Sequence, residues 1–337
     1  MADGDNVVLD VKGLKKYFPL RSTGFRRQLV GQIKAVDDVS FQVRVGETVG
    51  VVGESGCGKT TLGRCVVRIY DPTAGDILLR LGGRQVSVGK LGKQDYREFR
   101  KSVQMVFQDP FASLNPRMNL LQTVGEPLLV NGIATGRDLE DRVTDVIRKV
   151  GLNVGFLRRF PHSFSGGQRQ RICIARALVV NPRVVVADEP VSALDVSIQA
   201  QILNLLQDLQ REFGLSYIFI SHNMSVVRYM SNRILVMYAG RLVETAPRDD
   251  LLYAPKHPYT AMLLSAVPKV TRLGEIARAE TLGEPPNLLA LPKGCVFNPR
   301  CPHTQDICRT EAPTLHNVGA DHFASCHFAE SLQLRGV

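Results

Sequence analysis

A glycine-rich segment between an apolar strand and a helix constrains the fold of this chain more than any other feature. The stretch 48–52 is apolar and β-rich, the pattern over 59–67 is helical, and Gly53-Glu-Ser-Gly-Cys-Gly-Lys59-Thr60 joins them. Glycines at this spacing let backbone N–H groups wrap a phosphate at a helix amino terminus. A tight turn with a chance lysine is the alternative, and the flanking strand and helix argue against it. The predicted nucleotide-binding residues here are Gly53, Glu54, Ser55, Gly56, Cys57, Gly58, Lys59, Thr60 and Thr61.

Strands and helices alternate around this loop, which predicts a mainly parallel sheet covered by helices. A polar, helix-rich region is expected from about 91 to 178, and Pro110 and Pro116 rule out a continuous helix over 108–116. An exposed loop is expected at 21–32, and strand again up to about Leu81. The remaining expected elements are strands at 7–11, 35–45, 48–52, 183–187 and 215–220, and helices at 59–67 and about 198–213.

Composition indicates a folded protein of one large domain with an appendage. Of its 337 residues, 44% are hydrophobic and 22% charged, both near globular averages. A net charge of +10 is compatible with nucleotides, an anionic membrane or nucleic acid. The basic residues are spread along the chain without a nucleic-acid-binding motif, so no nucleic acid partner is expected. No apolar run is long enough to span a bilayer, and Met1-Ala-Asp-Gly-Asp lacks a signal-peptide pattern, so we expect a cytoplasmic protein.

Two adjacent carboxylates follow the apolar strand in Val184-Val-Val-Ala-Asp188-Glu189. Such a pair can hold Mg²⁺ through its water and polarise an attacking water molecule. We expect Asp188 to serve the metal and Glu189 the water. A strand that ends in acids is common by itself. Because this strand lies downstream of a complete phosphate loop, we interpret its two acids as part of the same phosphate site.

A serine-capped helix is predicted by Phe164-Ser165-Gly-Gly-Gln168 and the residues that follow. Its amino terminus would expose N–H groups to an anion, although an isolated string of this kind is often an ordinary helix cap. The string resembles the Leu-Ser-Gly-Gly-Gln signature of ABC-transporter ATPases, with Phe164 in the place of leucine. The resemblance implies that the signature of one subunit covers the γ-phosphate bound by another, through Ser165, Gly166, Gly167 and Gln168.

Other motifs of ABC-transporter ATPases follow in the family's order. They are Gln108 in the loop that senses the γ-phosphate, Ser192-Ala-Leu-Asp195 after the acids, and His222 after a strand. The resemblance implies that Tyr17 stacks on adenine, with the adjacent Phe18 as the alternative. It also implies catalysis of ATP hydrolysis by Lys59, Gln108, Glu189 and His222, with Mg²⁺ held by Thr60, Gln108 and Asp188.

The resemblance covers essentially the whole chain and narrows to the oligopeptide and dipeptide importer branch. Two segments resemble those of this branch. They are 108–116, and Pro255-Lys-His-Pro-Tyr-Thr260 with the Leu-Leu and Ala-Val-Pro268 that follow. It implies an α/β P-loop NTPase fold with a RecA-like core, an antiparallel β subdomain and a helical signature subdomain at about 91–178. This nucleotide-binding domain would comprise residues 1–250, and 251–337 would form a small cysteine-bearing extension.

The same resemblance implies partners and a location. The chain would work peripherally on the cytoplasmic side of the inner membrane with a second ABC ATPase subunit, identical or paralogous. Two transmembrane permease subunits and an extracytoplasmic solute-binding protein would complete the importer. The expected solute is a di- or oligopeptide, with nickel, glutathione or an oligosaccharide as alternatives. A non-transport ABC ATPase is the competing class, and the absence of tandem cassettes or long coiled-coil insertions argues against it.

Four late cysteines, Cys295, Cys301, Cys308 and Cys326, have the spacing C-x5-C-x6-C-x17-C. Four thiolates can enclose Zn²⁺ or carry an iron–sulfur cluster, and spacing alone does not separate these. The resemblance implies a [4Fe–4S] cluster, while free thiols are a further alternative. We expect a structural role, because the tail has few large apolar residues and lies outside every ATPase motif. The other cysteines, Cys57, Cys65 and Cys173, are expected to be packing residues.

Overall fold

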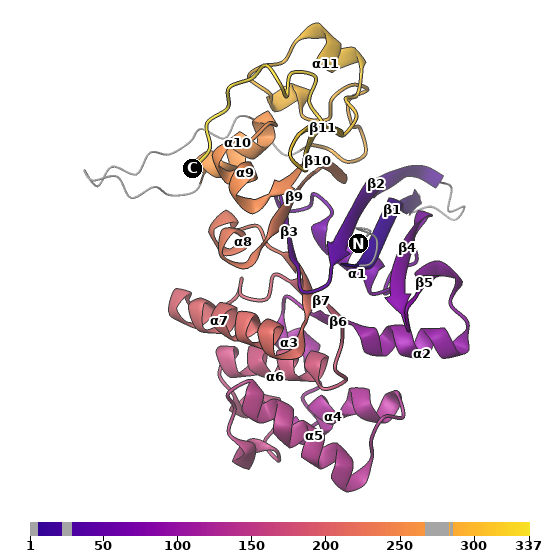
Figure 1. Ribbon diagram of the computed structural model, residues 1–337, viewed down its shortest axis with the longest axis vertical. Helices are drawn as coiled ribbons and strands as arrows, with labels where there is room; N and C mark the ends of the chain where they lie inside the picture. The colour runs from indigo at the N-terminus through magenta and orange to yellow at the C-terminus, as the bar shows by residue number, and fades with distance from the viewer. Residues whose placement is uncertain (1–5, 22–28, 267–282, 284–285) are drawn as a thin grey trace, which may run out of the picture.

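Two sheets organise the protein in the computed structural model, which describes residues 6–21, 29–266, 283 and 286–337 (Figure 1). Within these residues an antiparallel sheet of order β2-β1-β4-β5 lies beside a larger sheet of order β11-β12-β10-β9-β3-β8-β7-β6. The strands of the smaller sheet are β1 (Val7–Arg21), β2 (Leu29–Arg44), β4 (Ala74–Leu81) and β5 (Arg84–Ser87). Those of the larger are β3 (Thr48–Val52), β6 (Val103–Val106), β7 (Val184–Asp188), β8 (Ser216–Ile220), β9 (Arg233–Tyr238), β10 (Arg241–Pro247), β11 (His316–Gly319) and β12 (His322–Ala324).

The centre of the larger sheet is parallel and completely buried. β3 pairs in parallel with β8 and β9, and β7 with β6 and β8. Every residue of β3, β7 and β8 is buried, as their apolar runs predict. The carboxyl ends of parallel strands meet at one edge, so the segments that follow these strands are brought together there. The flanking helices are α1 (Lys59–Val66), α7 (Val196–Phe213) and α8 (Met224–Met230).

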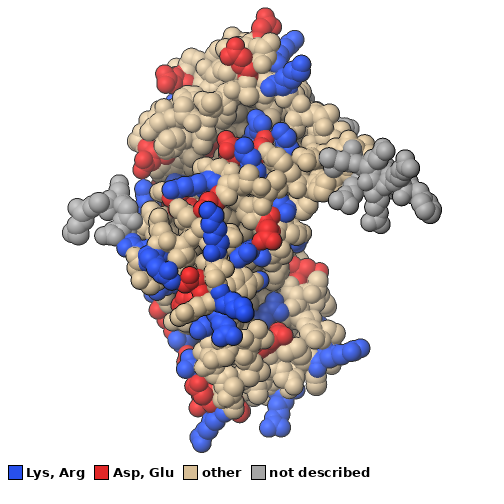
Figure 2. Space-filling model, turned by 90° about the vertical axis from the view of Figure 1, so that its right-hand side faces the viewer, with Lys and Arg blue, Asp and Glu red and all other residues tan. Residues whose placement is uncertain are grey.

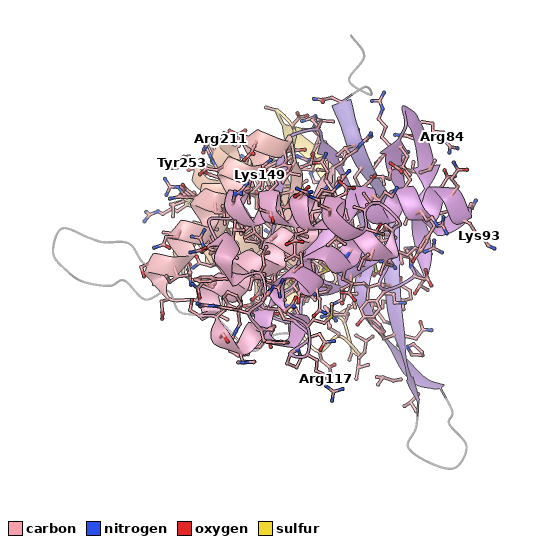
Figure 3. All side chains as sticks on the ribbon, turned by 90° about the horizontal axis from the view of Figure 1, so that it is seen from below. Arg84, Lys93, Arg117, Lys149, Arg211 and Tyr253 are labelled. Carbon is pink, nitrogen blue, oxygen red and sulfur yellow. The ribbon has the colours of Figure 1, made fainter. Side chains whose placement is uncertain are left out.

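A helical subdomain lies at one end of the molecule, opposite the carboxy-terminal extension (Figure 1). It contains α4 (Leu120–Val130), α5 (Gly136–Lys149) and α6 (Gly166–Leu178), and the chain enters it through α2 (Lys93–Ser102), β6 and α3 (Pro110–Ser113). Viewed from this end, Arg84 and Lys93 lie on the side of the smaller sheet, and Arg211 and Tyr253 on the opposite side (Figure 3). On the face drawn in Figure 2, Lys and Arg are interspersed with Asp and Glu.

The extension continues the larger sheet. It contains α9 (Arg248–Tyr253), α10 (Pro258–Ser265), α11 (Asp306–Thr310), β11 and β12. β12 pairs antiparallel with β10, with Ala324 opposite Glu244. The Glu244 side chain is fully buried and lies 2.6 Å from His322 Nε2, and it accepts hydrogen bonds from the backbone N–H groups of Lys256 and His257. The division at residue 250 stays a prediction.

Several predicted bounds need correction. β1 extends as far as Arg21, and β2 begins at Leu29. Both ends of the loop expected at 21–32 are therefore strand, and residues 22–28 lie outside the described residues. β6 is a strand inside the region expected to be helical, missed because it has only four residues and follows a charged helix. A single helical turn, α3, begins at Pro110 with Asp109 as its cap. Met1–Asp5 and Val267–Pro268 also lie outside the described residues.

Candidate active site

The glycine-rich loop between β3 and α1 is held against two neighbouring strands. Gly53 has φ 151° and Gly58 has φ 107°, backbone conformations that favour glycine. A Cβ atom at Gly58 would lie 2.0 Å from the carbonyl oxygen of Ala35, and one at Gly53 would lie 2.2 Å from that of Met237. Both positions therefore require glycine, because backbone atoms close the space around them.

Lys59 lies inside the loop at the start of α1. Its ammonium group donates hydrogen bonds to the carbonyl oxygens of Gly53 and Glu54, each at 2.8 Å. The residue is buried, so the charge sits among loop atoms rather than in bulk water. A lysine in this place at a helix amino terminus is positioned to bind phosphate oxygens.

Thr60 and Asp188 meet at the same edge of the sheet. The Thr60 hydroxyl donates to Asp188 Oδ1 at 3.0 Å, and Asp188 is almost completely buried. Burial raises the pKa of Asp188, while the Thr60 hydrogen bond and the charge of Arg64 act in the opposite direction. A hydroxyl and a carboxylate are the hard oxygen donors that suit Mg²⁺, so these residues fit the predicted metal site.

Glu189 is held by residues from two other segments. Gln108 Nε2 donates to one carboxylate oxygen at 2.9 Å, and His222 Nδ1 lies 3.1 Å from the other. The backbone of Glu189 has φ 46°, a strained conformation for a non-glycine residue, and its N–H donates to the carbonyl of Ile220. The segments after β6, β7 and β8 thus converge on one carboxylate.

These groups surround a cavity of about 570 Å³, a size suited to a small-molecule ligand. Its lining is mixed, with apolar and polar residues and one residue of the carboxy-terminal extension. Its lining residues are Phe18, Ile33, Ala35, Ser55, Gly56, Gly58, Lys59, Thr60, Thr61, Gln108, Glu189, His222 and Leu288.

The lining of the cavity includes Phe18 but not Tyr17. The Tyr17 hydroxyl donates to Asp37, which also binds Arg241 Nη2 at 2.7 Å. Burial and the neighbouring Asp37 carboxylate raise the pKa of Tyr17 to about 12. Of the two residues expected to stack on adenine, Phe18 lines the cavity and Tyr17 does not, and the choice between them stays a prediction.

Three predicted nucleotide-binding residues of the loop are also outside the lining: Gly53, Glu54 and Cys57. Gly53 faces the backbone of β9, and the Cys57 thiol is buried, which raises its pKa. Cys65 and Cys173 are buried as well, in agreement with a packing role. Glu54 instead forms an ion pair with Arg300. Sequence reasoning missed Arg300, since no local pattern links residues 246 positions apart.

The predicted signature residues form the amino terminus of α6 and lie outside the cavity lining. Ser165 Oγ accepts from the N–H of Gln168 at 3.3 Å, and Gln168 Oε1 accepts from the N–H of Ser165 at 3.0 Å. This reciprocal capping box satisfies two helix-end N–H groups. Ser165 is exposed and Gly166 and Gly167 are partly exposed, so this helix end is available to a ligand bound elsewhere.

The four late cysteines line a second, small cavity together with histidines that include His257 and His327. Cys308 and Cys326 are buried, and Cys295 and Cys301 are partly buried. Among the described residues, however, no group of three or more His, Cys, Asp and Glu side chains is arranged to hold a metal ion. The structure brings the four predicted ligands together without supporting the predicted cluster.

Comparison with known proteins extends this picture along the whole chain. The family described as "ABC transporter" matches residues 36–192, and "Oligopeptide/dipeptide transporter, C-terminal region" matches 243–308. The oligopeptide transport ATP-binding protein AppF of Bacillus subtilis (strain 168) is 49% identical, over 97% of this chain and 98% of the relative. The chain belongs to the ABC transporter family, in its oligopeptide/dipeptide branch. This ABC ATPase is also 47% identical to the dipeptide transport ATP-binding protein DppF of Haemophilus influenzae, over 95% and 96% of the two chains.

Solved structures agree with the fold of this ABC ATPase. A dimeric ATP-binding cassette, MJ0796, bound to ADP and Pi has a TM-score of 0.60 and 27% identity, over 71% of this chain and 98% of that one. The predicted P-loop fold and the predicted family are therefore confirmed. The enzymatic activity of the family is ATP hydrolysis, so ATP and Mg²⁺ are the cofactors of this protein. No helix among the described residues is long and apolar enough to cross a membrane.

Replacing Lys59 by alanine is expected to weaken ATP binding by the isolated subunit about tenfold or more, the effect of losing one charge-assisted hydrogen bond. The contact that we expect to be lost is the predicted one to the β- and γ-phosphates. Titration with a fluorescent ATP analogue measures the affinity for ATP. Lys93→Ala, in α2 and outside the lining of the cavity, is a matched control. Unchanged affinity in Lys59→Ala would contradict the assignment of the loop.

Proposed function

We propose that this chain is the ATP-hydrolysing subunit of an importer that takes up di- or oligopeptides across the cytoplasmic membrane. The observation that carries the proposal is the end-to-end match with relatives named for oligopeptide and dipeptide transport, which includes the branch-specific C-terminal region. The geometry of the cavity supplies the chemistry for such a motor.

The hydrolytic roles are proposed from the contacts around Glu189. Its carboxylate, oriented by Gln108 and His222, accepts a hydrogen bond from the attacking water and aims it at the γ-phosphate. His222 contacts the γ-phosphate, and Lys59 stabilises the charge that develops on the phosphate oxygens. Mg²⁺, when bound with ATP near Thr60 and Asp188, neutralises further phosphate charge. Phe18 stacks on the adenine.

A second cassette is proposed to complete each ATP site. The signature residues of α6 are exposed and do not line the cavity of their own chain. The related cassette whose printed title calls it dimeric supports such a pairing. Two cassettes arranged in opposite directions would each cover the other's γ-phosphate, and closure on ATP would be reversed by hydrolysis. The second cassette would be another copy of this chain or a paralogue of it.

Contact with two permease subunits is proposed at the helical subdomain, on the cytoplasmic side of the membrane. Apolar side chains are exposed in α3 and at the end of α4: Phe111 is 67% exposed and Val130 is 80% exposed. Exposed apolar groups of this kind favour a protein partner. Through Gln108, movement at such a contact would reach Glu189.

The transport proposal is tested with the complete importer in proteoliposomes, assembled from this subunit, its second cassette, both permeases and the binding protein. Labelled di- and oligopeptides should accumulate inside in an ATP-dependent manner. Nickel, glutathione and an oligosaccharide are compared in parallel. Accumulation of one of these instead of peptides would support the role as the ATPase subunit of an importer but change the proposed solute. ATP hydrolysis without uptake of any solute would favour a non-transport ABC ATPase.

We also propose that Cys295, Cys301, Cys308 and Cys326 hold one [4Fe–4S] cluster, with Zn²⁺ as the alternative. The four side chains line one cavity, which supports a shared group. A tetrahedral zinc site needs all four sulfurs at about 2.3 Å from one point. The shared cavity fits either group, and the measurement below chooses between them.

Anaerobically purified protein is expected to be brown, with broad absorption at about 400 nm, and Cys301→Ser should bleach it and destabilise the extension. Absorption, iron and sulfide content measure this, and Cys173→Ser in α6 is the matched control that keeps the colour. One zinc per chain in a colourless protein would replace the cluster by a zinc site. A metal-free, fully active protein would contradict both.

A further inference from the structure

The cysteine-bearing extension forms a direct ion pair with the phosphate loop. Arg300 Nη1 lies 2.7 Å from Glu54 Oε2, and Nη2 lies 2.8 Å from Oε1, so the guanidinium binds both carboxylate oxygens. The Arg300 side chain is 5% exposed and the Glu54 side chain 24%. Bidentate pairs that are largely buried hold a more definite geometry than surface ion pairs, which contribute little. The extension is therefore in a position to orient the loop.

The backbone of Glu54 is held as firmly as its side chain. Its N–H donates to the hydroxyl of Tyr259 on α10 at 2.8 Å, and its carbonyl accepts from Lys59 at 2.8 Å. The Glu54 carbonyl also accepts from the N–H of Cys57 at 3.3 Å, so every polar group of Glu54 has a partner. Two of the four partners, Arg300 and Tyr259, come from the extension. The loop conformation thus depends on residues far from it in the sequence.

Arg300 is itself packed among aromatic rings. Its guanidinium carbon lies 5.8 Å from the centroid of the Tyr238 ring and 5.9 Å from that of Phe297. The Tyr238 and Phe297 rings pack edge to face, with their centroids 5.2 Å apart. Leu288, also in the extension, lines the ATP cavity. The extension, which lies outside every ATPase motif, therefore contacts both the phosphate loop and the ATP cavity.

We propose that Arg300 is a positioning residue for ATP binding, which holds the phosphate loop through Glu54 and cancels the negative charge of that residue. Loop N–H groups bind phosphate best when they are preorganised. An uncompensated carboxylate in the same loop would repel the polyphosphate. The docked extension is then part of the ATP-binding machinery. The inference rests on the ATPase function and does not depend on which group the cysteines hold.

The test compares ATP binding by the full-length Arg300→Ala subunit with that of wild type. The dissociation constant is expected to rise about tenfold, the size of one lost charge-assisted contact. In the assembled importer, KM for ATP should rise by a similar factor while kcat stays within about twofold of wild type. The reason is that the phosphate loop reaches its ATP-bound conformation once the site is saturated with ATP. Arg309→Ala, an exposed arginine of α11 in the same extension, should bind ATP as wild type does.

A rescue variant separates this role from a merely structural one. Glu54→Gln added to Arg300→Ala removes the uncompensated charge, so most of the lost affinity should return. Failure to recover any affinity would overturn the charge argument. Should Arg300→Ala not fold, Arg300→Lys keeps the charge without the bidentate geometry and should bind about threefold more weakly.

The outcomes also separate this inference from the ATPase assignment. Wild-type affinity in Arg300→Ala, with Lys59→Ala weakened as expected, overturns the role of Arg300 and leaves the ATPase standing. Wild-type affinity in both variants would overturn the assignment of the site as well.

Discussion

Glu189→Gln is expected to reduce ATP hydrolysis by the assembled transporter about 100-fold or more, the range for removal of a general base. Glutamine keeps the size of the side chain and a partner for Gln108, but it cannot accept a proton or hold the attacking water as a carboxylate does. ATP binding should be retained, because the phosphate loop is untouched. Phosphate release measures turnover, and size-exclusion chromatography with ATP should show a trapped closed dimer.

The control for this variant is Glu212→Gln, an exposed glutamate of α7 whose carboxylate pairs with Lys149. Exposed substitutions of this kind change stability little, so turnover should remain at the wild-type level. Wild-type turnover in Glu189→Gln itself would remove Glu189 from its assigned role. A loss of ATP binding in that variant would instead indicate a collapsed site.

Ser165→Arg is expected to lower hydrolysis by the complex about 100-fold, as removal of one anion-stabilising contact does in other enzymes. The new side chain would place bulk and charge at the γ-phosphate of the opposite cassette. ATP binding by the isolated subunit should survive, since Ser165 lies outside the lining of its own cavity. Hydrolysis and binding are measured on the two preparations separately.

Ser165→Thr is the matched control, because threonine retains the hydroxyl that caps α6. It should preserve most of the activity, which would show that the loss in Ser165→Arg does not follow from every substitution at this position. The isolated subunit is expected to be a weak ATPase. Monomers that hydrolyse ATP at the full rate of the complex would rule out the paired-site arrangement.

The local motifs could be read from the sequence because each depends on short-range chemistry. The strand, loop and helix around Lys59 have the expected order, and the apolar runs at β7 and β8 are buried as predicted. These features are determined by glycine spacing and strand ends, which are local properties of short stretches of sequence. The acids at the end of β7 and the residues after β8 meet because parallel strands end at one edge.

Contacts between distant segments could not be predicted in the same way. The choice between Tyr17 and Phe18 depends on which side chain the β1 bulges turn toward Asp37, and alternation alone does not give it. Arg300 reaches Glu54 only because the aromatic cluster of Tyr238 and Phe297 docks the extension beside the loop. The contribution of Leu288 to the cavity has the same origin.

The pairing of β12 with β10 has a consequence for the order in which the chain can fold during synthesis. Glu244 is buried beneath His322, which leaves the ribosome 78 residues later. Until then β10 has an open edge, and the Glu244 carboxylate lacks its imidazole partner. An open strand edge is a template for pairing with other chains. The ATPase body therefore emerges with one side unprotected until β12, translated later, pairs with β10.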